Sequence, residues 1–252
     1  MSRTLQIVLP MVGLGSRFAN AGFATPKPLI EVDGMPMFRK ALSSLEDIKA
    51  KKRYVFVIRQ EHVDTQKLDT LITKALPEAE IVVVLEVTRG AAESVLAAKP
   101  KLNAQDALIS LDCDLWFESA SYYKMVQDSL TGVSDIDGGV LTFPSNDPKY
   151  SYAAVDEKGM VTRTAEKQVI SNSATTGAYF FAKAGTFTTH AEALLAKPLS
   201  ETMKEYYISF VYGLLLADGG KVQAATVNKF ASFGTPEELD AYNNGTQTFT
   251  LG

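Results

Sequence analysis

Cysteine, histidine and tryptophan are scarce in this chain of 252 residues, which contains one, two and one of them respectively. Because Cys113 is the only cysteine, an intramolecular disulfide and a cysteine metal cluster are excluded, and a reduced, cytoplasmic compartment is expected. The two histidines, His62 and His190, lie in helix-like stretches, and we interpret both as structural. The chemistry of this protein is therefore expected to depend on other residue types.

Long hydrophobic runs and an excess of positive charge are also missing. No stretch approaches the roughly eighteen consecutive apolar residues of a membrane span. The N-terminal run is broken by Pro10 and by glycines, and it lacks the layout of a signal peptide. The 25 Lys and Arg residues against 29 Asp and Glu residues give a net charge of −4, whereas a nucleic-acid binder carries a basic stripe. We therefore expect neither a membrane nor a nucleic acid as a partner.

The first half of the chain alternates strand and helix patterns. Continuous apolar runs, typical of buried parallel strands, occupy residues 5–9, 53–58, 80–87 and 107–111. Helix-like stretches lie between them, at about 36–48, 62–76 and 91–99. Because strands and helices that alternate in this way form right-handed crossovers, the pattern predicts an α/β fold with a mostly parallel sheet covered on both faces.

The second half has shorter elements. Its patterns predict a helix at 119–130, strands at 138–143, 151–156, 160–164 and 176–182, helices at 187–196 and 201–217, a strand at 221–227 and a helix at 236–243. The stretch "DEKG" (156–159) is typical of a hairpin turn. No Ser-, Pro- or Gly-rich linker divides the chain. We therefore expect a single domain over residues 1–252, with two halves that meet near residue 118.

The stretch "GLGSRF" (13–18) directly follows the first apolar run. A dinucleotide fingerprint would need a third glycine where Phe18 stands, and the P-loop pattern does not occur, so a plain strand-to-loop turn stays open. The next stretch, "ANAGFATPKPLIEVDGMPM" (19–37), places Lys27 between two prolines that are expected to hold its backbone extended. Arg17 with its planar fork and Lys27 with its point charge suit a polyphosphate.

Together these stretches, "GLGSRF…GFATPKPLIEVDGMPM", resemble the signature of the sugar nucleotidyltransferases, or nucleoside-diphosphate-sugar pyrophosphorylases. The resemblance implies a Rossmann-like fold, a mixed, mostly parallel sheet flanked by helices as in one class of glycosyltransferases. It also implies a Mg²⁺-dependent reaction, in which a phosphorylated metabolite attacks the α-phosphorus of a nucleoside triphosphate and pyrophosphate leaves. Residues 1–118 would bind the nucleotide and residues 119–252 the acceptor.

The resemblance assigns roles to the glycine-rich loop. The nucleotide would lie against the end of the first strand and the loop, at Pro10, Met11, Gly13, Gly15, Ser16 and Arg17. Arg17 and Lys27 would neutralise the triphosphate as pyrophosphate leaves. No general base is expected, because a phosphate monoester is largely dianionic at neutral pH and is already nucleophilic.

A second glycine lies at the start of a predicted helix, in "TRGAAESVLAA" (88–98). The free N–H groups of a first helical turn favour acceptors or anions, and glycine allows close approach to the backbone. In the family the matching loop contacts the nucleotide base, which makes Gly90, Ala91 and Glu93 candidates. The alternative is an ordinary helix N-terminus with Glu93 as an acid favoured by the helix dipole.

Two carboxylates end the fourth apolar run in "ISLDCDLWF" (109–117). The carboxyl ends of strands are where open α/β sheets bind ligands, and carboxylate oxygens suit Mg²⁺. By resemblance Asp114 is the principal metal ligand, and Asp112 is a second ligand that also contacts the nucleotide. Asp114, Arg17 and Lys27 are thus the predicted catalytic residues. "DCD" is equally the D-x-D pattern of metal-dependent glycosyltransferases.

The stretch "TAEKQVISNSATTGAYFF" (164–181) resembles the acceptor region of the family. Glu166 and Lys167 would hold hydroxyls and phosphate of the acceptor, next to Thr176 and Gly177. Two positions depart from the family pattern. Phe210 follows "KEYYIS" (204–209) where an acidic residue is often found, and Ser232 in "FASFGTPEEL" (230–239) replaces the acidic or amide residue that commonly completes the metal site.

The favoured interpretation is a nucleotidyltransferase that forms an activated sugar or a similar metabolite, for surface polysaccharide or a related pathway. Its predicted partners are a nucleoside triphosphate, with a pyrimidine base favoured, and a phosphorylated small-molecule acceptor; a homo-oligomer stays open. The alternatives are a glycosyltransferase that uses "DCD", and a nucleotide-binding relative whose site has decayed, which Ser232 and Phe210 would suit.

Overall fold

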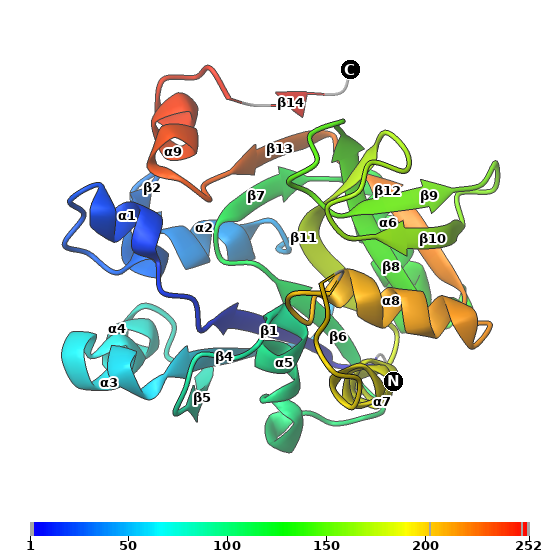
Figure 1. Cartoon of the computed structure of the whole chain (residues 1–252), viewed down its shortest axis with the longest axis horizontal. Coiled ribbons are helices and arrows are strands. Elements are labelled where there is room, and N and C mark those ends of the chain that lie inside the picture. Colours follow the sequence, from blue (N-terminus) through cyan, green and yellow to red (C-terminus); the bar gives the residue numbers. More distant parts are fainter. Residues whose placement is uncertain (1–2, 202, 248, 251–252) are drawn as a thin grey trace.

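The computed structural model describes residues 3–201, 203–247 and 249–250. Its centre is a nine-stranded sheet (Figure 1) with the order β10-β9-β11-β6-β1-β4-β5, which β8 and β12 extend from β11. The strands of this sheet are β1 (Leu5–Met11), β4 (Lys52–Arg59), β5 (Ala79–Val84), β6 (Ala107–Leu111), β8 (Gly138–Pro144), β9 (Tyr152–Val155), β10 (Val161–Ala165), β11 (Ser173–Phe181) and β12 (Val222–Thr226).

The strands β6, β1, β4 and β5 are parallel neighbours, as the apolar runs predict. Alternate residues of β1 enter two different cores: Ile7 and Leu9 belong to one, and Val8 to the other. A strand that is buried on both faces has no polar face, which is why its sequence is a continuous apolar run. β5 lies at the edge and pairs only with β4 among the described strands, and it ends at Val84 rather than at the predicted residue 87.

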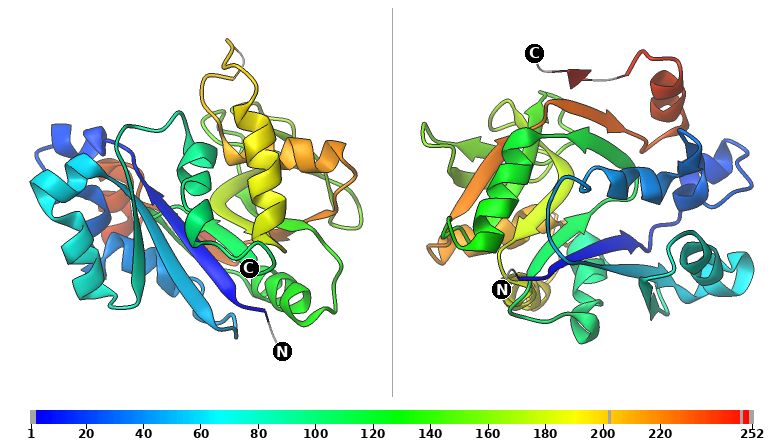
Figure 2. Two further views of the ribbon diagram at one scale, coloured as in Figure 1. Left: turned by 90° about the horizontal axis from the view of Figure 1, so that it is seen from below. Right: turned by 180° about the vertical axis from the view of Figure 1, so that it is seen from behind.

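Helices cover both faces of the sheet. The first core contains residues of α2 (Met37–Ser43), α4 (Leu68–Ala75) and α6 (Ala120–Thr131). In the right-hand view of Figure 2, α6 (green) lies in front of the sheet and α4 (cyan) lies at the right. The second core contains residues of α5 (Ala91–Leu96), α7 (Ala184–Leu195) and α8 (Ile208–Ala217), on the side that faces the viewer in Figure 1. The fold is thus a mixed, mostly parallel sheet flanked by helices, as predicted.

The second half adds antiparallel strands to the sheet. β11 runs antiparallel to β6, β8 and β9, whereas β12 is parallel to β8. The register of β11 against β8 shifts between Thr175 and Tyr179. This irregularity contains Gly177 with a φ of +100°, so β11 bends next to the carboxyl end of β6.

A second, three-stranded sheet joins distant parts of the sequence. It consists of β7 (Leu115–Glu118), β13 (Lys229–Ser232) and β14 (Phe249–Thr250), with β13 in the middle. A third core packs next to it, from α1 (Ser16–Asn20), the hairpin of β2 (Glu31–Val32) and β3 (Met35–Pro36), and α9 (Pro236–Asn243). α1, which follows the glycine-rich loop, therefore lies near α9 from the far end of the sequence (Figure 1).

Several predicted elements are wrong in their bounds. The helix expected at 62–76 is two helices, α3 (Gln60–Gln66) and α4, because Lys67 between them adopts a left-handed conformation with φ +54°. The helix expected at 36–48 ends at Ser43, and the one at 91–99 ends at Leu96 before a 3₁₀ turn, η2 (Lys99–Lys101). The helix expected at 201–217 begins only at Ile208; residue 202 lies outside the described residues.

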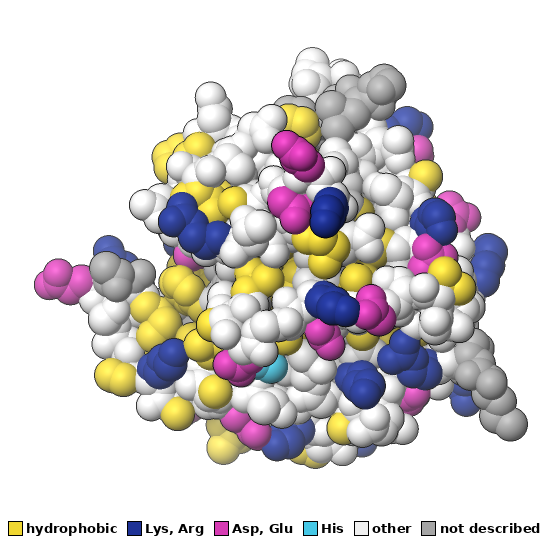
Figure 3. All heavy atoms as spheres, turned by 90° about the vertical axis from the view of Figure 1, so that its right-hand side faces the viewer, with side chains coloured by type: hydrophobic (Ala, Val, Ile, Leu, Met, Phe, Trp, Pro, Cys, Tyr) yellow, Lys and Arg dark blue, Asp and Glu magenta, His cyan; other side chains and the backbone are white. Residues whose placement is uncertain are grey.

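The molecular surface mixes charges of both signs. On the face that Figure 3 shows, Lys and Arg side chains stand among Asp and Glu side chains. In the part of the chain that the structure describes, no helix is both long enough and apolar enough to cross a membrane.

Candidate active site

A cleft of about 310 Å³ opens where the carboxyl end of β6 meets β7, β11 and β13. Polar and aromatic side chains from both halves of the chain surround it. Its lining residues are Ala91, Asp112, Asp114, Leu115, Lys149, Tyr150, Ser151, Thr175, Thr176, Gly177, Tyr179, Tyr207, Ile208 and Ser232. The site lies at the carboxyl end of a central strand, as expected for an open α/β sheet.

Asp112 and Asp114 follow β6 and both line the cleft. The N–H of Asp112 donates to the carbonyl of Gly177 at 3.0 Å, so the bend of β11 holds this turn. A Cβ at position 177 would lie 2.5 Å from Oδ2 of Asp112, and the φ of +100° also requires glycine. Burial, and then the charge of Asp114, raise the pKa of Asp112. Gly177 therefore serves to make room for a carboxylate of the "DCD" turn.

Lys27, from the "PKPL" stretch of the signature (26–29), contacts the same turn. Its Nζ lies 2.5 Å from Oδ2 of Asp114, and the two side chains are only 18% and 26% exposed. Burial alone would raise the pKa of Asp114, but the charge and hydrogen bond of Lys27 hold that pKa below its ordinary value. The backbone at Lys27 is not extended as predicted. Lys27–Leu29 form a 3₁₀ turn, η1, because proline is well suited to the first positions of a helix.

The glycine-rich loop lies directly beside Lys27. Gly15 adopts a left-handed conformation with φ +62°, and a Cβ there would be 3.5 Å from Cβ of Lys27. Arg17 follows on α1 and is exposed, and its guanidinium has no ion pair or hydrogen bond with any described residue. Its charge helps to lower the pKa of Asp114. Arg17 is therefore a free cation near the cleft.

The other loop residues are placed differently. Pro10 and Met11 end β1, and Met11 is buried in the first core. Gly13 and Ser16 are exposed on the loop itself. The structure thus brings the loop to the Lys27 side of the cleft, although these four residues are not among those that line it.

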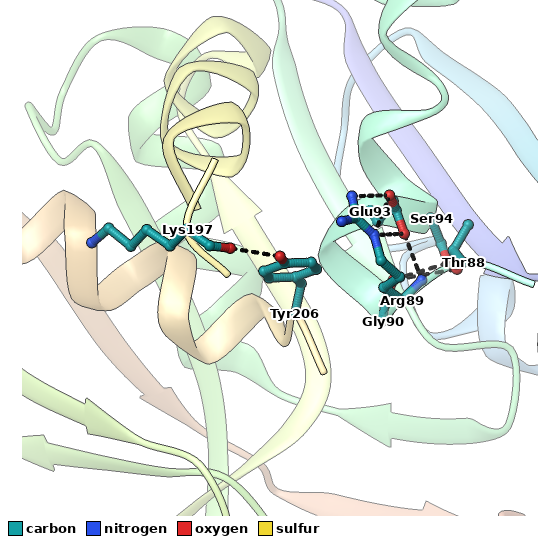
Figure 4. A network of polar contacts seen from close by, with 7 residues as sticks. All are labelled: Thr88, Arg89, Gly90, Glu93, Ser94, Lys197 and Tyr206. Atoms are coloured by element: carbon teal, nitrogen blue, oxygen red, sulfur yellow. Dashed lines mark hydrogen bonds and ion pairs between the residues drawn. The ribbon is translucent and has the colours of Figure 1, made fainter. Parts of the chain in front are cut away.

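The predicted base-contacting loop starts α5, where Gly90 and Glu93 lie close to Arg89 (Figure 4). Of the three candidates in this loop, only Ala91 lines the cleft. Glu93 accepts hydrogen bonds from the backbone N–H of Arg89 at 2.5 Å and from its guanidinium at 2.6 Å. Gly90 has φ +143°, and a Cβ there would meet the backbone N and O of Tyr206 at 2.6 Å each. The open side of Gly90 thus faces a neighbouring segment of the chain.

The predicted acceptor residues come from β11 and from the loop that joins β10 to it. Glu166 accepts hydrogen bonds from the hydroxyls of Ser151 and, at 2.8 Å, Ser209, and burial raises its pKa. Lys167 has φ +51°, and its Nζ donates to the hydroxyl of Tyr207 at 2.7 Å. Thr176 and Gly177 line the cleft directly, whereas Glu166 and Lys167 contact residues that line it.

Ser232 lies at the end of β13 and lines the cleft close to Asp114. In the β13–β7 pair it stands opposite Leu115, and the next N–H, of Phe233, donates to the carbonyl of Asp114 at 2.7 Å. The hydroxyl of Ser232 donates to Oε2 of Glu238 at 2.9 Å. Ser232, which was predicted to stand in place of an acidic or amide residue, is therefore hydrogen-bonded to a carboxylate of α9.

Several residues of the site were not singled out in the sequence, notably Lys149, Tyr150, Ser151 and Glu238. Glu238 also accepts from the N–H of Gly234 at 2.9 Å, and its own N–H donates to Thr235 Oγ1 at 3.2 Å. The bond from Glu238 to the N-cap Thr235 is one half of a capping box, which "TPEE" (235–238) would have indicated, whereas the carboxylate binds the N–H of Gly234 instead of that of Thr235. The segment around Lys149 carries no comparable pattern.

Comparison with known proteins finds a match over most of the chain. A family model described as nucleotidyl transferase matches residues 7–211 of the chain. The chain belongs to the nucleotidyl transferase family. It is 24% identical over 251 residues to a UTP–glucose-1-phosphate uridylyltransferase of Haloferax volcanii, and the match covers 94% of each protein.

Solved structures show the same nucleotidyl transferase fold. A nucleoside-diphosphate-sugar pyrophosphorylase from Vibrio cholerae has a TM-score of 0.79 and 24% identity, with 95% of this chain and 99% of that one covered. The inositol-1-phosphate CTP transferase of T. maritima has a TM-score of 0.73 and 16% identity, with 98% and 95% covered. A putative glucose-1-phosphate thymidylyltransferase from Bacillus anthracis has a TM-score of 0.74 and 19% identity, with 99% and 97% covered.

The resemblance predicted from the signature is thereby confirmed, as are the fold and the enzyme class. Nucleotidyltransferases of this family generally use a divalent metal ion. The described residues contain no group of three or more His, Cys, Asp or Glu side chains that could hold a metal on their own. Asp112 and Asp114 with the hydroxyl of Ser232 fit a hard cation that takes its remaining oxygen ligands from substrate phosphates and water.

Proposed function

We propose that this protein is a sugar-phosphate nucleotidyltransferase. It transfers a nucleoside monophosphate from a pyrimidine nucleoside triphosphate to the phosphate of a sugar 1-phosphate or a similar phosphorylated metabolite. An oxygen of the acceptor phosphate forms a bond to the α-phosphorus, the bond from this phosphorus to the bridging oxygen breaks, and pyrophosphate leaves. The observation that carries the proposal is the ion pair of Lys27 and Asp114, which joins the "PKPL" stretch of the signature to the "DCD" turn that lines the cleft.

Positioning and charge neutralisation are sufficient for this reaction. The acceptor phosphate is already nucleophilic at neutral pH, since its second pKa is about 6. Lys27 is held in place by Asp114, and the guanidinium of Arg17 has no partner among the described residues, so both can meet phosphate oxygens of the triphosphate. Charges that are fixed before the reaction stabilise the transition state without reorganisation.

Asp114 and Asp112 would hold a Mg²⁺ ion, with Asp114 as the principal ligand. When bound, the ion would neutralise the charge that develops on the phosphate oxygens. The roles of Asp114, which lines the cleft, and Lys27 are then linked, because their ion pair holds each side chain in position.

The choice of nucleotide and acceptor is supported by two observations. The Haloferax volcanii, T. maritima and Bacillus anthracis proteins are named for UTP, CTP and thymidylyl transfer, and these are all pyrimidine nucleotides. Thr176 and Gly177 also line the cleft together with the carboxylates, and Glu166 and Lys167 are hydrogen-bonded to its lining residues Ser151 and Tyr207 respectively. We propose that Pro10, Gly13 and Ser16 guide the nucleotide and that the acceptor binds on the side of Lys167. Supply of an activated sugar for surface polysaccharide is the role that we propose for the product.

The test is a matrix of substrates. UTP, CTP, dTTP, ATP and GTP are each incubated with Mg²⁺ and with glucose 1-phosphate, other sugar 1-phosphates or inositol 1-phosphate, and released pyrophosphate is measured. We expect pyrophosphate from a pyrimidine triphosphate only when an acceptor is present. The Asp114→Asn variant, prepared identically, controls for contaminating enzymes. Nucleotide binding without pyrophosphate from any pair would support a decayed site, and release of a nucleoside diphosphate from a nucleotide sugar would support a glycosyltransferase.

A further inference from the structure

Four successive residues, Tyr206–Ser209, run from the predicted nucleotide loop to the predicted acceptor loop; we call them the linking segment. Their sequence was predicted to be helical, but Tyr206 and Tyr207 precede α8, which begins at Ile208. The N–H of Tyr206 donates to the carbonyl of Arg89 at 2.9 Å, and the N–H of Ala92 donates to the carbonyl of Tyr206 at 2.8 Å. Two backbone hydrogen bonds thus join the segment to the start of α5.

Gly90 makes this join possible. A Cβ at position 90 would lie 2.6 Å from both the N and the O of Tyr206, which real side chains essentially never do. The position of Tyr206 and the conformation of Gly90 therefore determine each other. The next residue, Ala91, lines the cleft, so a shift of Tyr206 would move the cleft wall.

The side chain of Tyr206 fixes this end of the segment more firmly. Its ring is buried, and its hydroxyl donates to the carbonyl of Lys197 at 2.6 Å (Figure 4). The guanidinium of Arg89 stacks 4.9 Å from the ring centroid, and Glu93 holds this guanidinium by hydrogen bonds. Glu93 therefore reaches the segment through Arg89.

The other end of the linking segment holds the acceptor residues. The hydroxyl of Tyr207 accepts from Nζ of Lys167 at 2.7 Å, and the hydroxyl of Ser209 donates to Glu166 at 2.8 Å. Tyr207 and Ile208 line the cleft between these contacts. One short segment is thus bonded to the nucleotide loop at its first residue and to the acceptor pair at its second and fourth residues.

We propose that the linking segment couples the two substrate subsites, so that Tyr206 and Ser209 are positioning residues for both substrates. The proposal rests on the proposed function. It follows from the geometry, because a displacement at either end moves backbone that the other subsite needs. Coupling free energies between two sites are typically about 1–3 kcal/mol, which corresponds to about 5- to 150-fold in affinity.

The test is a pair of effects across the subsites. Ser209→Ala removes one hydrogen bond to Glu166 from a buried helical position that alanine suits. We expect it to raise the dissociation constant of the triphosphate about fivefold or more, as measured by calorimetry with Mg²⁺ and without acceptor. Gly90→Ala is expected to raise the KM of the acceptor at saturating triphosphate by at least as much. The triphosphate and acceptor used are the pair that gives pyrophosphate fastest with the wild-type protein.

Two matched variants control for nonspecific effects. Ser129→Ala changes a buried helical serine of α6 whose hydroxyl has no hydrogen-bond partner among the described residues. Gly132→Ala introduces Cβ at φ +78° with no neighbour within 4 Å. Both are expected to leave the two constants unchanged, and the unfolding temperature of each variant shows whether it is folded.

The outcomes separate the two proposals. If the wild-type protein neither binds nor turns over a triphosphate, the proposed function fails. If it does, and Ser209→Ala changes only the KM of the acceptor while the triphosphate dissociation constant stays within twofold of wild type, the coupling is refuted. Tyr206→Phe loses only the hydrogen bond from its hydroxyl to Lys197. It is therefore expected to weaken triphosphate binding less than Gly90→Ala does. An equal or stronger effect of Tyr206→Phe would also refute the coupling.

Discussion

Removal of the Lys27 ammonium is the perturbation that bears most directly on the signature loop. The Lys27→Ala variant loses a charge that lies 2.5 Å from Asp114 and whose side chain is only 18% exposed. Its Nζ also lies 5.6 Å from the ring centroid of Phe18, so the amine has contacts on two sides. The charge is thus fixed before substrate binds, which is the condition under which such groups contribute most to catalysis.

Loss of one preorganised contact to developing charge typically lowers kcat about 10²- to 10³-fold, or about 2.7–4 kcal/mol. We therefore expect Lys27→Ala to lower kcat by at least 10²-fold in the pyrophosphate assay, with a smaller change in the KM of the triphosphate. An interaction that is stronger in the transition state than in the ground state gives this pattern.

A matched variant separates catalysis from folding. Lys40→Ala removes another well-packed lysine, with a side chain 12% exposed, which pairs with Asp33 at 2.7 Å and lies over the ring of Trp116 outside the cleft. It is expected to lower the unfolding free energy by about 1 kcal/mol and to leave kcat unchanged. If Lys27→Ala keeps more than a tenth of the wild-type kcat while folded, the assignment of Lys27 is wrong.

Three further predictions concern the walls of the cleft and the core. Ser232→Asp alone is expected to lower the unfolding temperature and to gain no Mg²⁺ affinity, because it places a second carboxylate where the serine donates to Glu238 at 2.9 Å. The double variant with Ser232→Asp and Glu238→Gln should restore the unfolding temperature. Activity measured against Mg²⁺ concentration checks the affinity of each variant. Gly177→Ala should lower kcat at least tenfold, since its Cβ would lie 2.5 Å from Oδ2 of Asp112; near wild-type turnover would contradict this account of the bend. Burial lowers the pKa of His62, so the unfolded state binds more protons than the folded state as the pH falls below the ordinary histidine pKa of about 6.5. The contribution of His62 to stability is therefore present above that pH and is lost as the pH falls. Between pH 7 and pH 5, the unfolding free energy measured in urea should decline less for His62→Gln than for wild type.

The parallel core was predictable because its signal is local. β1 and β6 at its centre are runs of apolar residues, because a strand that is buried on both faces has no polar face. The signature residues were also recognisable, since Lys27 and the "DCD" turn are fixed by short motifs. What the motifs did not contain was the ion pair between them, which forms only when residues 87 positions apart are brought together.

The parts that were not predicted depend on distant partners or on single backbone conformations. β7 and β13 have four residues each and are stabilised by pairing with each other across more than a hundred positions. Lys67 divides a continuous helical pattern by adopting a left-handed conformation, which is uncommon for a residue with a side chain. The linking segment was predicted to be helical because its apolar residues continue into α8. Instead, the backbone N–H of Tyr206 forms a hydrogen bond with the distant Arg89.

The pairing of β7 with β13 has a consequence for the order in which the protein is made. A nascent chain that has emerged as far as α8 carries the signature loop, both aspartates and the acceptor pair. This chain still lacks Phe233, whose N–H donates to the carbonyl of Asp114, and it also lacks the hydrogen-bonded pair of Ser232 and Glu238. We therefore expect the site to be assembled only after residue 239 has left the ribosome, so that a translation product interrupted after α8 would carry the complete signature and no working cleft.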